Sequence, residues 1–548
     1  MREIDRLTTE QFGIPSLVLM ENAAAATARV IVATLSGEIS EKSVLILCGR
    51  GNNGGDGAAT ARLLAHAGAN INTILFGKVE QTRDDARTNF DALASLAADQ
   101  DSGVTGNVRF FECATDEDSR KISASLFTDS PDVIVDALFG TGLTRPLAGV
   151  HEEVVNRVNR LRNSASTDTL VVSIDIPSGL NSDTAQLIGE AVRADITITM
   201  TAPKFANVLA PASNYNGKLI VADIGSPGEL IEQAKSILFL TEEADARRWL
   251  IETRYTPDSY KNTHGHAVIV AGSRGFTGAA ALCANAAMRA GAGLVTVATP
   301  ASAQPLVATQ VMPEVMTTAL AETDRGAVSD EAINYFSKFI DRADVIAIGP
   351  GLSAEDERTR KFVRAAVEER STAAVIDADG LNSLSPWPEE LSGSQDFPIV
   401  LTPHPGEMLR LMGTSDRSAL DDRVTAAREF AKKHSVLLLL KGTRSLIAAP
   451  DGRVFINPTG NAGLGTAGAG DTLTGIITGF LAQASAYRPA RGNARVNALE
   501  TVIAALYVSG LAGDWAAREH GMRSMVASDI RERLSAVISL LDPRGERP

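Results

Sequence analysis

Cysteine, aromatic side chains and net positive charge are all scarce in this sequence. The only cysteines among 548 residues are Cys48, Cys113 and Cys283, and none belongs to a CxxC pair. This argues against a disulfide framework and against a cysteine-ligated zinc site. Aromatic residues make up 5% of the chain, and the formal net charge is −14. So acidic a chain is not expected to bind nucleic acid or anionic membranes, and an anionic ligand would need a local site.

Long apolar runs and targeting features are also missing. We find no stretch with the length and apolarity of a membrane span and no N-terminal signal pattern, so we expect a cytoplasmic protein. The length predicts two domains, or at most three, because one hydrophobic core does not serve 548 residues. Glycine, by contrast, is frequent at 46 residues, which suits an α/β protein with many tight turns.

The first half of the chain alternates apolar runs with helical patterns. The predicted strands are residues 44–49, 71–77, 108–113, 133–140, 170–179, 196–200 and 219–225. The predicted helices between them are residues 55–68, 82–98 and 150–162. This alternation predicts a Rossmann-like, three-layer domain whose mostly parallel sheet is covered on both faces.

The second half repeats this style and predicts a second α/β domain. Its predicted strands are residues 266–272, 294–300, 345–351, 373–380, 398–404 and 436–442. A helix is expected at 279–290 and a hairpin turn at 451–452. Residues 226–262 are polar and less periodic, so we place the boundary near 235 and expect domains 1–235 and 236–548. We expect a surface loop at 485–494 and a frayed end in the last residues.

The most informative stretch is residues 460–480, GNAGLGTAGAGDTLTGIITGF. Glycines crowd before Asp471, and a run of good helix formers follows it. A glycine-rich turn lets the backbone approach a ligand closely, and the first helical turn presents free N–H groups to an anion. Asp471 adds a carboxylate that can take a proton from a hydroxyl. The competing interpretation is a tight turn in which Asp471 is a plain N-cap.

A second glycine-rich turn, GRGNNGGDG at 49–57, follows the first predicted strand and contains a literal GxGxxG. A hydride-transfer Rossmann site also needs an acid at the end of the second strand, but that strand ends in FGK at 76–78. An ordinary dinucleotide dehydrogenase is therefore disfavoured. What remains is a phosphate-cradling loop that carries Asn52, Asn53 and Asp56.

Two further strand ends of the first half carry polar residues. Asp136 closes one strand, and Asp175 and Ser178 close another. Ligands of open parallel sheets bind beyond the carboxyl ends of the strands, so these residues can face one crevice. Asn53, Asp136 and Ser178 offer only oxygen ligands, which suit a hard cation. Taken one at a time, the two aspartates could equally be helix caps.

Several of these motifs resemble the N-terminal domain of the bifunctional NAD(P)H-hydrate repair enzymes over about residues 1–225: GNNGGDG, VDALFGTGL, IDIPSG, TAPK at 201–204 and LMENAA at 19–24. In that family this domain epimerises the R and S forms of hydrated NADH and NADPH (NADHX and NADPHX). The resemblance implies a potassium ion held by Asn53, Asp136 and Ser178. It also implies that the dinucleotide is bound by Asn52, Asn53, Gly54, Gly55, Asp56, Gly140, Thr141, Gly142, Leu143, Thr144, Arg145, Pro146 and Asp175.

Epimerisation at a carbon that bears a hydroxyl and the ring nitrogen requires reversible loss of configuration there. Asp175 is our candidate for proton transfer, with Lys204 assisting, although both could simply bind. Members of the family usually have a longer leading helix before MREIDR, so the resemblance leaves the natural start of the chain open.

The second half carries motifs that resemble the ribokinase-like fold, and within it the NAD(P)H-hydrate dehydratases, over about residues 240–540. They are AGSRGFTGAA at 271–280, IGPGL at 348–352, DADGLNSL at 377–384, LTPHPGEM at 401–408 and KGTRS at 441–445. Each alone is an ordinary strand-to-helix turn. A lone His404 is more often a structural histidine, and Lys441 could be a solvated charge.

The resemblance implies a fold that uses ADP, or ATP, with magnesium to dehydrate the S hydrate. It implies hydrate contacts from Ala279, Gly351, His404 and Asp471, and nucleotide contacts from Lys441, Gly442, Thr443, Arg444, Ser445 and Gly470. Asp471 would take the hydroxyl proton during phosphorylation, after which phosphate leaves.

Two alternatives stay open at this point. One is a ribokinase-like kinase of a small molecule such as a vitamin precursor, with an accessory binding domain. The other is a binding protein whose first half is an interaction module without catalysis. The glycine turn before Asp471 fits a kinase and a repair enzyme equally, whereas HPGE and GNNGGDG favour repair. The sequence leaves open ADP against ATP, NADHX against NADPHX and passage of product between sites; such folds favour a homo-oligomer.

Overall fold

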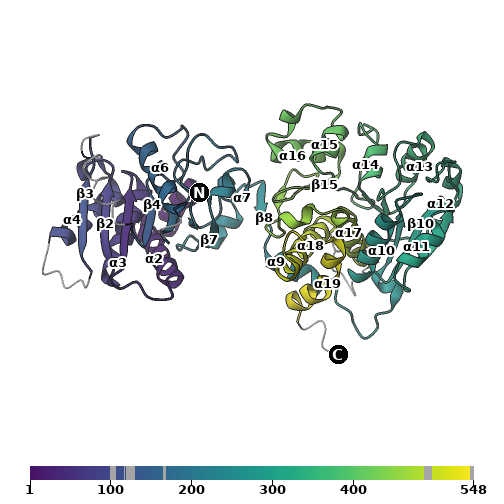
Figure 1. The fold of residues 1–548 in the computed structure, drawn as a ribbon, viewed down its shortest axis with the longest axis horizontal. Helices are drawn as coiled ribbons and strands as arrows, with labels where there is room; N and C mark the ends of the chain where they lie inside the picture. Colours follow the sequence, from purple (N-terminus) through teal and green to yellow (C-terminus); the bar gives the residue numbers. More distant parts are fainter. Residues whose placement is uncertain (99–105, 116–117, 119–129, 165–167, 487–496, 544–548) are drawn as a thin grey trace. The chain divides into compact units, whose positions relative to one another are not determined.

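The computed structural model describes residues 1–98, 106–115, 118, 130–164, 168–486 and 497–543. The chain forms two compact units, Met1–Lys235 (unit 1) and Ser236–Pro548 (unit 2), which are taken separately below (Figure 1). Most of the predicted loop at 485–494 lies outside the described residues, as do the last five residues of the chain.

Unit 1 is built on a seven-stranded sheet in which every neighbouring pair is parallel. The strand order is β3-β2-β1-β4-β5-β6-β7. All strands predicted for the first half are present: β1 (Ser43–Cys48), β2 (Asn70–Leu75), β3 (Val108–Glu112), β4 (Val133–Ala137), β5 (Leu170–Ile174), β6 (Ile196–Met200) and β7 (Lys218–Ala222).

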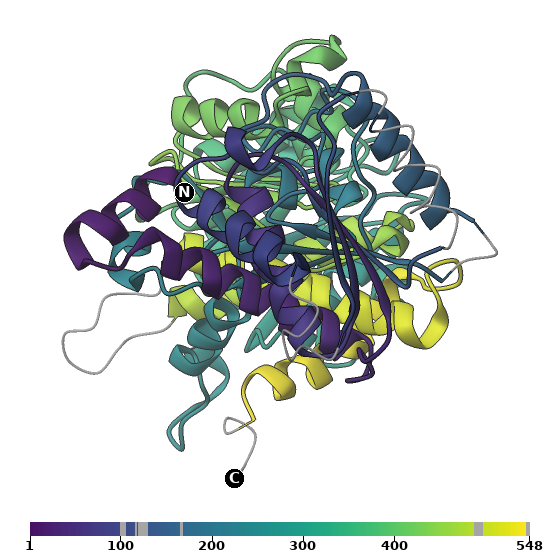
Figure 2. The same cartoon turned by 90° about the vertical axis from the view of Figure 1, so that its left-hand side faces the viewer.

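Helices cover both faces of this sheet, which confirms the predicted three-layer α/β architecture (Figures 1 and 2). Alternate residues of β1 point to opposite cores: Ile46 packs with the helices α2 to α4, and Leu47 packs with α6. Gly57 lets α3 lie directly on the sheet, because a Cβ there would be 2.6 Å from the Ala137 Cβ. The helices are α1 (Arg2–Phe12), α2 (Ser16–Thr34), α3 (Asn52–His66), α4 (Asp84–Ala98), α6 (Val150–Arg162), α7 (Phe205–Val208) and α8 (Gly228–Glu232).

Helix α2 corrects one expectation. By length and composition alone it is apolar enough to cross a membrane, with a mean hydropathy of 1.4 over its most apolar window. Its apolar residues are divided by Glu21, Asn22 and Arg29, so the sequence shows no unbroken apolar run. In unit 1, residues Leu19, Ala23 and Ile31 of this helix are buried in the core beside α3. It is therefore packed as a core helix of a folded domain.

Unit 2 contains a ten-stranded sheet in the order β11-β10-β9-β12-β13-β14-β15-β16-β17-β8. The pairs from β11 to β15 are parallel, and the predicted turn at 451–452 forms the antiparallel hairpin of β16 and β17. The strands are β8 (Leu238–Leu240), β9 (His266–Val270), β10 (Leu294–Pro300), β11 (Met316–Leu320), β12 (Val345–Ile348), β13 (Ala373–Ile376), β14 (Ile399–Leu401), β15 (Leu437–Leu440), β16 (Leu446–Ala448) and β17 (Val454–Ile456).

Two strands of this sheet, β8 and β11, were not predicted. Both are edge strands. Two threonines interrupt the apolar run of β11, and β8 is only three residues long and lies in a mostly polar stretch. The stretch at 226–262, expected to be irregular, contains β8 together with helix α9 (Glu243–Glu252). The capping box at Glu242 and Asp245 is the local feature that marks the start of α9.

The centre of unit 2 is a pair of helices, α10 (Thr277–Arg289) and α17 (Ala469–Ala486), in backbone-close contact. A Cβ at Gly475 would lie 2.1 Å from the carbonyl oxygen of Cys283, and one at Gly479 would lie 2.6 Å from that of Ala287. Since both numbers increase together, the helices run in the same direction. The remaining helices are α11 (Gln304–Gln310), α12 (Ile333–Ile340), α13 (Glu357–Glu368), α14 (Asp379–Ser383), α15 (Pro405–Leu411), α16 (Arg423–His434), α18 (Ala498–His520) and α19 (Ala527–Leu541).

Candidate active sites

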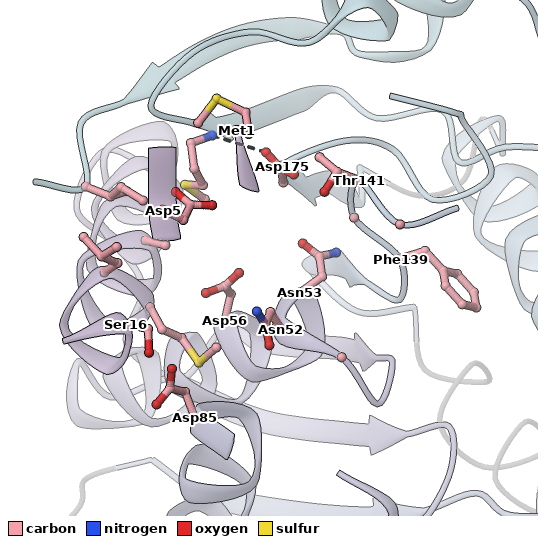
Figure 3. Close-up of a pocket in the computed structure, with 18 of the residues that line it drawn as sticks. Met1, Asp5, Ser16, Asn52, Asn53, Asp56, Asp85, Phe139, Thr141 and Asp175 are labelled. Atoms are coloured by element: carbon pink, nitrogen blue, oxygen red, sulfur yellow. Dashed lines mark hydrogen bonds between the residues drawn. The ribbon is translucent and has the colours of Figure 1, made fainter. Parts of the chain in front are cut away.

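Unit 1 contains a cavity of about 590 Å³ between helices α1 to α3 and the loops that follow β4 to β6 (Figure 3). Predicted site residues that line it are Asn52, Asn53, Asp56, Gly140, Thr141, Gly142, Leu143, Asp175 and Lys204. Other predicted residues do not line it: Gly54, Gly55, Asp136, Thr144, Arg145, Pro146 and Ser178. Gly54 and Gly55 have a packing role: a Cβ on Gly54 would lie 1.8 Å from the Gly49 carbonyl oxygen, and one on Gly55 would lie 2.8 Å from the Met20 sulfur.

Asp175 and Lys204 form a buried ion pair at the wall of this cavity. The side chains are 14% and 7% exposed, and Lys204 Nζ donates to Asp175 Oδ1. The lysine is fixed further because it also donates to Thr199 Oγ1 at 2.9 Å and to the Met200 carbonyl oxygen at 3.0 Å. Asp175 has a φ of 66°, a left-handed backbone conformation that aspartate adopts more readily than most residues. Directly after β5, this conformation turns its side chain toward the cavity. Sequence reasoning named both residues, and the fold brings them into direct contact.

Asp136 lies behind the cavity and is fully buried. Its carboxylate accepts hydrogen bonds from Ser178 N at 2.8 Å, from Ser173 Oγ at 2.8 Å and from Ser178 Oγ. Burial raises the pKa of Asp136, and these hydrogen bonds oppose that rise. Beside this group, Asn53 is 9% exposed and its Nδ2 has no hydrogen-bond partner among the described residues. A Cβ on Gly140 would lie 3.3 Å from Asn53 Oδ1, so the second glycine turn closes over the asparagine.

The cavity also contains carboxylates that sequence reasoning missed, Asp5 from α1 and Asp85 from α4 (Figure 3). Asp5 Oδ1 is buried without a hydrogen-bond partner among the described residues. Burial, followed by the charge of Asp175, raises the pKa of Asp56 well above its usual range. No strand end or glycine turn precedes Asp5 or Asp85 in the sequence, so no local pattern marks them.

In unit 2 the predicted motifs converge at the carboxyl ends of β13 to β15. Lys441, after β15, donates to Asp377 Oδ1 at 2.8 Å, and Thr474 of α17 donates to Asp377 Oδ2 at 2.7 Å. Glu407 of α15 lies 3.9 Å from Lys441 Nζ. Burial lowers the pKa of Lys441, but the charges of Asp377 and Glu407 raise it, and the net shift is upward. Lys441 is therefore held as a cation rather than being a loosely solvated charge.

Asp471 lies in the first turn of α17, not at its N-cap, and is close enough to this cluster for the charges of Asp377 and Lys441 to act on it. Burial, followed by the negative charge of Asp377, raises its pKa to about 7, although the charge of Lys441 opposes the shift. The preceding Gly470 is adjacent, since a Cβ there would lie 3.4 Å from Lys441 Nζ and 3.7 Å from Asp377 Oδ2. A carboxylate with such a pKa can exchange a proton near neutrality.

The loop at 441–445 is held by an arginine that sequence reasoning did not single out. Arg423 of α16 donates to the carbonyl oxygens of Leu440, Lys441 and Thr443 at 3.1 to 3.4 Å. Gly442 takes a φ of 147°, and Arg444 a φ of 55°. Arg423 thus fixes the backbone of this loop.

The remaining predicted contacts fall into two places. Ala279 and Gly351 are neighbours, because a Cβ on Gly351 would lie 3.1 Å from the Ala279 Cβ. His404 caps α15: its Nδ1 accepts from the N–H groups of Gly406 at 3.0 Å and Glu407 at 3.4 Å. The ring is still 52% exposed. Because Nδ1 accepts, the neutral ring carries its proton on Nε2, which leaves that nitrogen as a donor.

Comparisons with known proteins decide the family. A curated relative from Moorella thermoacetica, called bifunctional NAD(P)H-hydrate repair enzyme Nnr, is 39% identical over 100% of this chain and 97% of its own length. A relative of the same name from Salinibacter ruber is 36% identical over 100% of this chain and 96% of its own. The chain belongs to the bifunctional NAD(P)H-hydrate repair enzymes. The resemblance read from the motifs is confirmed.

Both halves of this repair enzyme match family models. Residues 16–206 match the YjeF-related protein N-terminus, and residues 267–536 match the NAD(P)H-hydrate dehydratase. Among solved structures, an ADP/ATP-dependent NAD(P)H-hydrate dehydratase from Bacillus subtilis, co-crystallized with ATP/Mg²⁺, is 28% identical with a TM-score of 0.46. That match covers 56% of this chain and 100% of the other.

The described residues of this repair enzyme contain no group of three or more histidine, cysteine, aspartate or glutamate side chains placed to hold a metal ion. In unit 1, the hydrogen-bond partners of Asp136 are hydroxyl and backbone N–H groups.

Proposed function

We propose that this protein repairs hydrated NADH and NADPH, with residues 1–235 epimerising the R and S hydrates and residues 236–548 dehydrating the S hydrate. The observation that carries the proposal is that one chain of this family holds two separate, preformed acid–base sites. One is the buried pair of Asp175 and Lys204 in the cavity of unit 1. The other is Asp471, whose pKa is about 7, at the start of α17.

In unit 1 the dinucleotide would lie along the two glycine turns. The residues proposed to bind it are Asn52, Asn53, Gly54, Gly55, Asp56, Gly140, Thr141, Gly142, Leu143, Thr144, Arg145 and Pro146. Asp175 would move the proton that allows the hydrated carbon to lose and regain its configuration. Lys204 holds the Asp175 carboxylate in place through their contact and can supply positive charge next to the hydroxyl.

A potassium ion fits the residues beside this cavity. Asp136 is a fully buried carboxylate, and its hydrogen-bond partners are hydroxyl and backbone N–H groups rather than cations. Asn53, Asp136 and Ser178 supply only oxygen and amide groups, which suit a weakly polarising monovalent cation better than zinc. Such an ion would offset the buried charge and stiffen the two turns that hold the dinucleotide.

In unit 2 the hydroxyl of the S hydrate would attack the terminal phosphoryl group of ADP or ATP while Asp471 takes its proton. The C–OH is thereby converted into a phosphate ester, and AMP or ADP is released. Phosphate then departs with the electrons of the C–O bond, assisted by the ring nitrogen lone pair, and loss of a proton from the neighbouring carbon restores the dihydronicotinamide. The N–H groups at the start of α17, including that of Gly470, would hold the charge on the transferring group.

The loop made of Lys441, Gly442, Thr443, Arg444 and Ser445 would bind the nucleotide, and Ala279, Gly351 and His404 would contact the hydrate. Magnesium would arrive with the nucleotide, whose phosphate oxygens supply its main ligands, and would neutralise phosphate charge. We also propose a cytoplasmic homo-oligomer, which light scattering of the purified protein tests.

The decisive experiment uses an equimolar mixture of R and S NADHX with ADP and magnesium, followed by the absorbance of reduced nicotinamide. We expect complete recovery of NADH with the unmodified protein. Asp175→Asn should restore only the S half, and Asp471→Asn should restore none while still equilibrating the two hydrates. A stable phosphorylated product without NADH would instead indicate a small-molecule kinase. Omitting ADP, or replacing it with ATP, establishes nucleotide dependence.

A further inference from the structure

Phe276 is a large apolar side chain that unit 2 leaves exposed. It immediately precedes α10, and 60% of its surface is accessible. Single exposed apolar residues are ordinary on protein surfaces, so exposure alone has no functional meaning. Phe276, however, also lies beside the residues proposed to contact the hydrate, and this position suggests a function for its side chain.

Phe276 is held against two residues proposed to contact the hydrate. A Cβ on Gly351 would lie 2.8 Å from the Phe276 carbonyl oxygen and 3.1 Å from both the Phe276 Cβ and the Ala279 Cβ. Gly351 has a φ of 67°, a conformation that also favours glycine. The turn at 273–276 is tied to the loop after β12, because Ser273 Oγ donates to the Gly351 carbonyl oxygen at 2.8 Å. The backbone of Phe276 is therefore fixed although its ring is exposed.

The same part of the fold contains the proposed catalytic base. Along the seam between α10 and α17, Gly475 lies against Cys283 and Ala286. Continuing this register less than two helical turns toward the N-termini places Ala279 level with the start of α17, where Asp471 lies. Phe276 directly precedes α10. It therefore lies at the same end of the helix pair as Asp471, the proposed base.

We propose that the ring of Phe276 forms the apolar wall of the dehydratase site and packs against the hydrated nicotinamide ring. This rests on the proposed function of unit 2. The cluster of Asp377, Lys441 and Asp471 is charged and offers no surface for the carbon face of the ring. Among the residues proposed to contact the hydrate, Ala279 and Gly351 have small side chains or none and His404 is polar, so none of them supplies a large apolar face. An aromatic face packs well against such a ring and limits the approach of water to the carbon from which phosphate departs.

The contact is expected to act on substrate binding rather than on chemistry. Packing of this kind holds the ground state and the transition state alike, so its loss raises KM and leaves kcat nearly unchanged. For Phe276→Ala we expect KM for the S hydrate to rise about tenfold, with KM for ADP changed less than about twofold. Phe276→Tyr should restore KM, and Phe276→Leu should be intermediate because it retains apolar volume without a flat face.

Tyr260→Ala is the matched control. Tyr260 is 62% exposed, and the turn that follows it packs near the far end of α17, where a Cβ on Gly265 would lie 2.1 Å from the Ala482 carbonyl oxygen. That end is about 16 Å from Asp471 along the helix. KM for the S hydrate should be unchanged in this variant.

A truncated substrate tests which end of the dinucleotide is contacted. Hydrated reduced nicotinamide mononucleotide lacks the adenosine half, and Phe276→Ala should raise its KM by the same factor. An unchanged KM for both substrates would overturn the proposal, and a rise only for the full dinucleotide would reassign the ring to adenine. Either result leaves dehydration by the unmodified protein intact, whereas failure of the proposed function would abolish it in every variant.

Discussion

The two candidate sites place a carboxylate beyond the ends of parallel strands, yet they use the nearby lysine differently. In unit 1, Lys204 contacts Asp175 directly at the wall of the cavity. In unit 2, Lys441 contacts Asp377 at 2.8 Å instead. Its charge acts on Asp471 without a direct hydrogen bond and opposes the rise in the pKa of that carboxyl. The two sites therefore differ in which carboxylate the lysine contacts: the proposed catalytic aspartate in unit 1 and its neighbour in unit 2. Asp175 is anchored as part of an ion pair, whereas Asp471 keeps a pKa of about 7 and can accept a proton.

Removing the carboxylate of Asp471 should have the largest effect. Asp471→Asn keeps the shape of the side chain but cannot take the hydroxyl proton, so we expect kcat for dehydration to fall about 10²- to 10⁴-fold. Epimerisation of the hydrates, followed by chromatography, should be unaffected. Asp451→Asn in the exposed hairpin turn is the control. Dehydration within a few-fold of normal would refute the role of Asp471.

Removing the carboxylate of Asp175 is the mirror experiment. Asp175→Asn should slow interconversion of the hydrates about 10²-fold or more, because the proton transfer loses its acceptor. Dehydration of pure S hydrate with ADP should keep its rate. Full-speed interconversion would show that Asp175 only binds the substrate, and a parallel loss of dehydration would contradict the independence of the two sites.

Breaking the buried pair from the lysine side should affect stability as well. Lys204→Met leaves Asp175 buried without its counter-charge, and we expect unit 1 to lose about 3 kcal/mol of unfolding free energy. Chemical denaturation measures this loss. The double variant Lys204→Met with Asp175→Asn should recover part of it, because the uncompensated charge is then gone. Simple additivity of the two changes would argue against a direct pair.

The smallest effect is expected in the pH dependence of dehydration, which tests whether Asp471 differs from Asp175 in acting as an unpaired base. Asp471 must be deprotonated to act as a base, so kcat/KM should fall about tenfold per pH unit below its pKa of about 7 and level off above it. Asp379→Asn should shift this acid limb to lower pH, because the negative charge of Asp379 contributes to the raised pKa. An acid limb that does not move would assign the titration to another group.

Much of this arrangement could be read from the sequence, since glycine turns and strand ends are local patterns. The parallel sheets and the hairpin at 451–452 follow from such patterns. The local pattern left Lys441 open as a solvated charge, and only the family resemblance placed it in one site with Gly470. What could not be predicted depends on tertiary packing. Asp5 enters the cavity from a helix without any local marker, and Arg423 reaches the 441–445 loop from a neighbouring helix. Edge strand β8 is only three residues long, so its apolar residues are too few to predict a strand.

The seam of α10 and α17 has a consequence for how unit 2 tolerates mutation. At Gly475 and Gly479 the two helices touch through backbone atoms, so no side chain there can adjust to absorb an error. Any larger residue must move one helix bodily, and the displacement reaches the reacting groups without being damped. A misplacement of about 1 Å can cost about 10²-fold in rate. Gly475 and Gly479 therefore set the distance between α10 and α17, and with it the position of Asp471 relative to the residues at the start of α10.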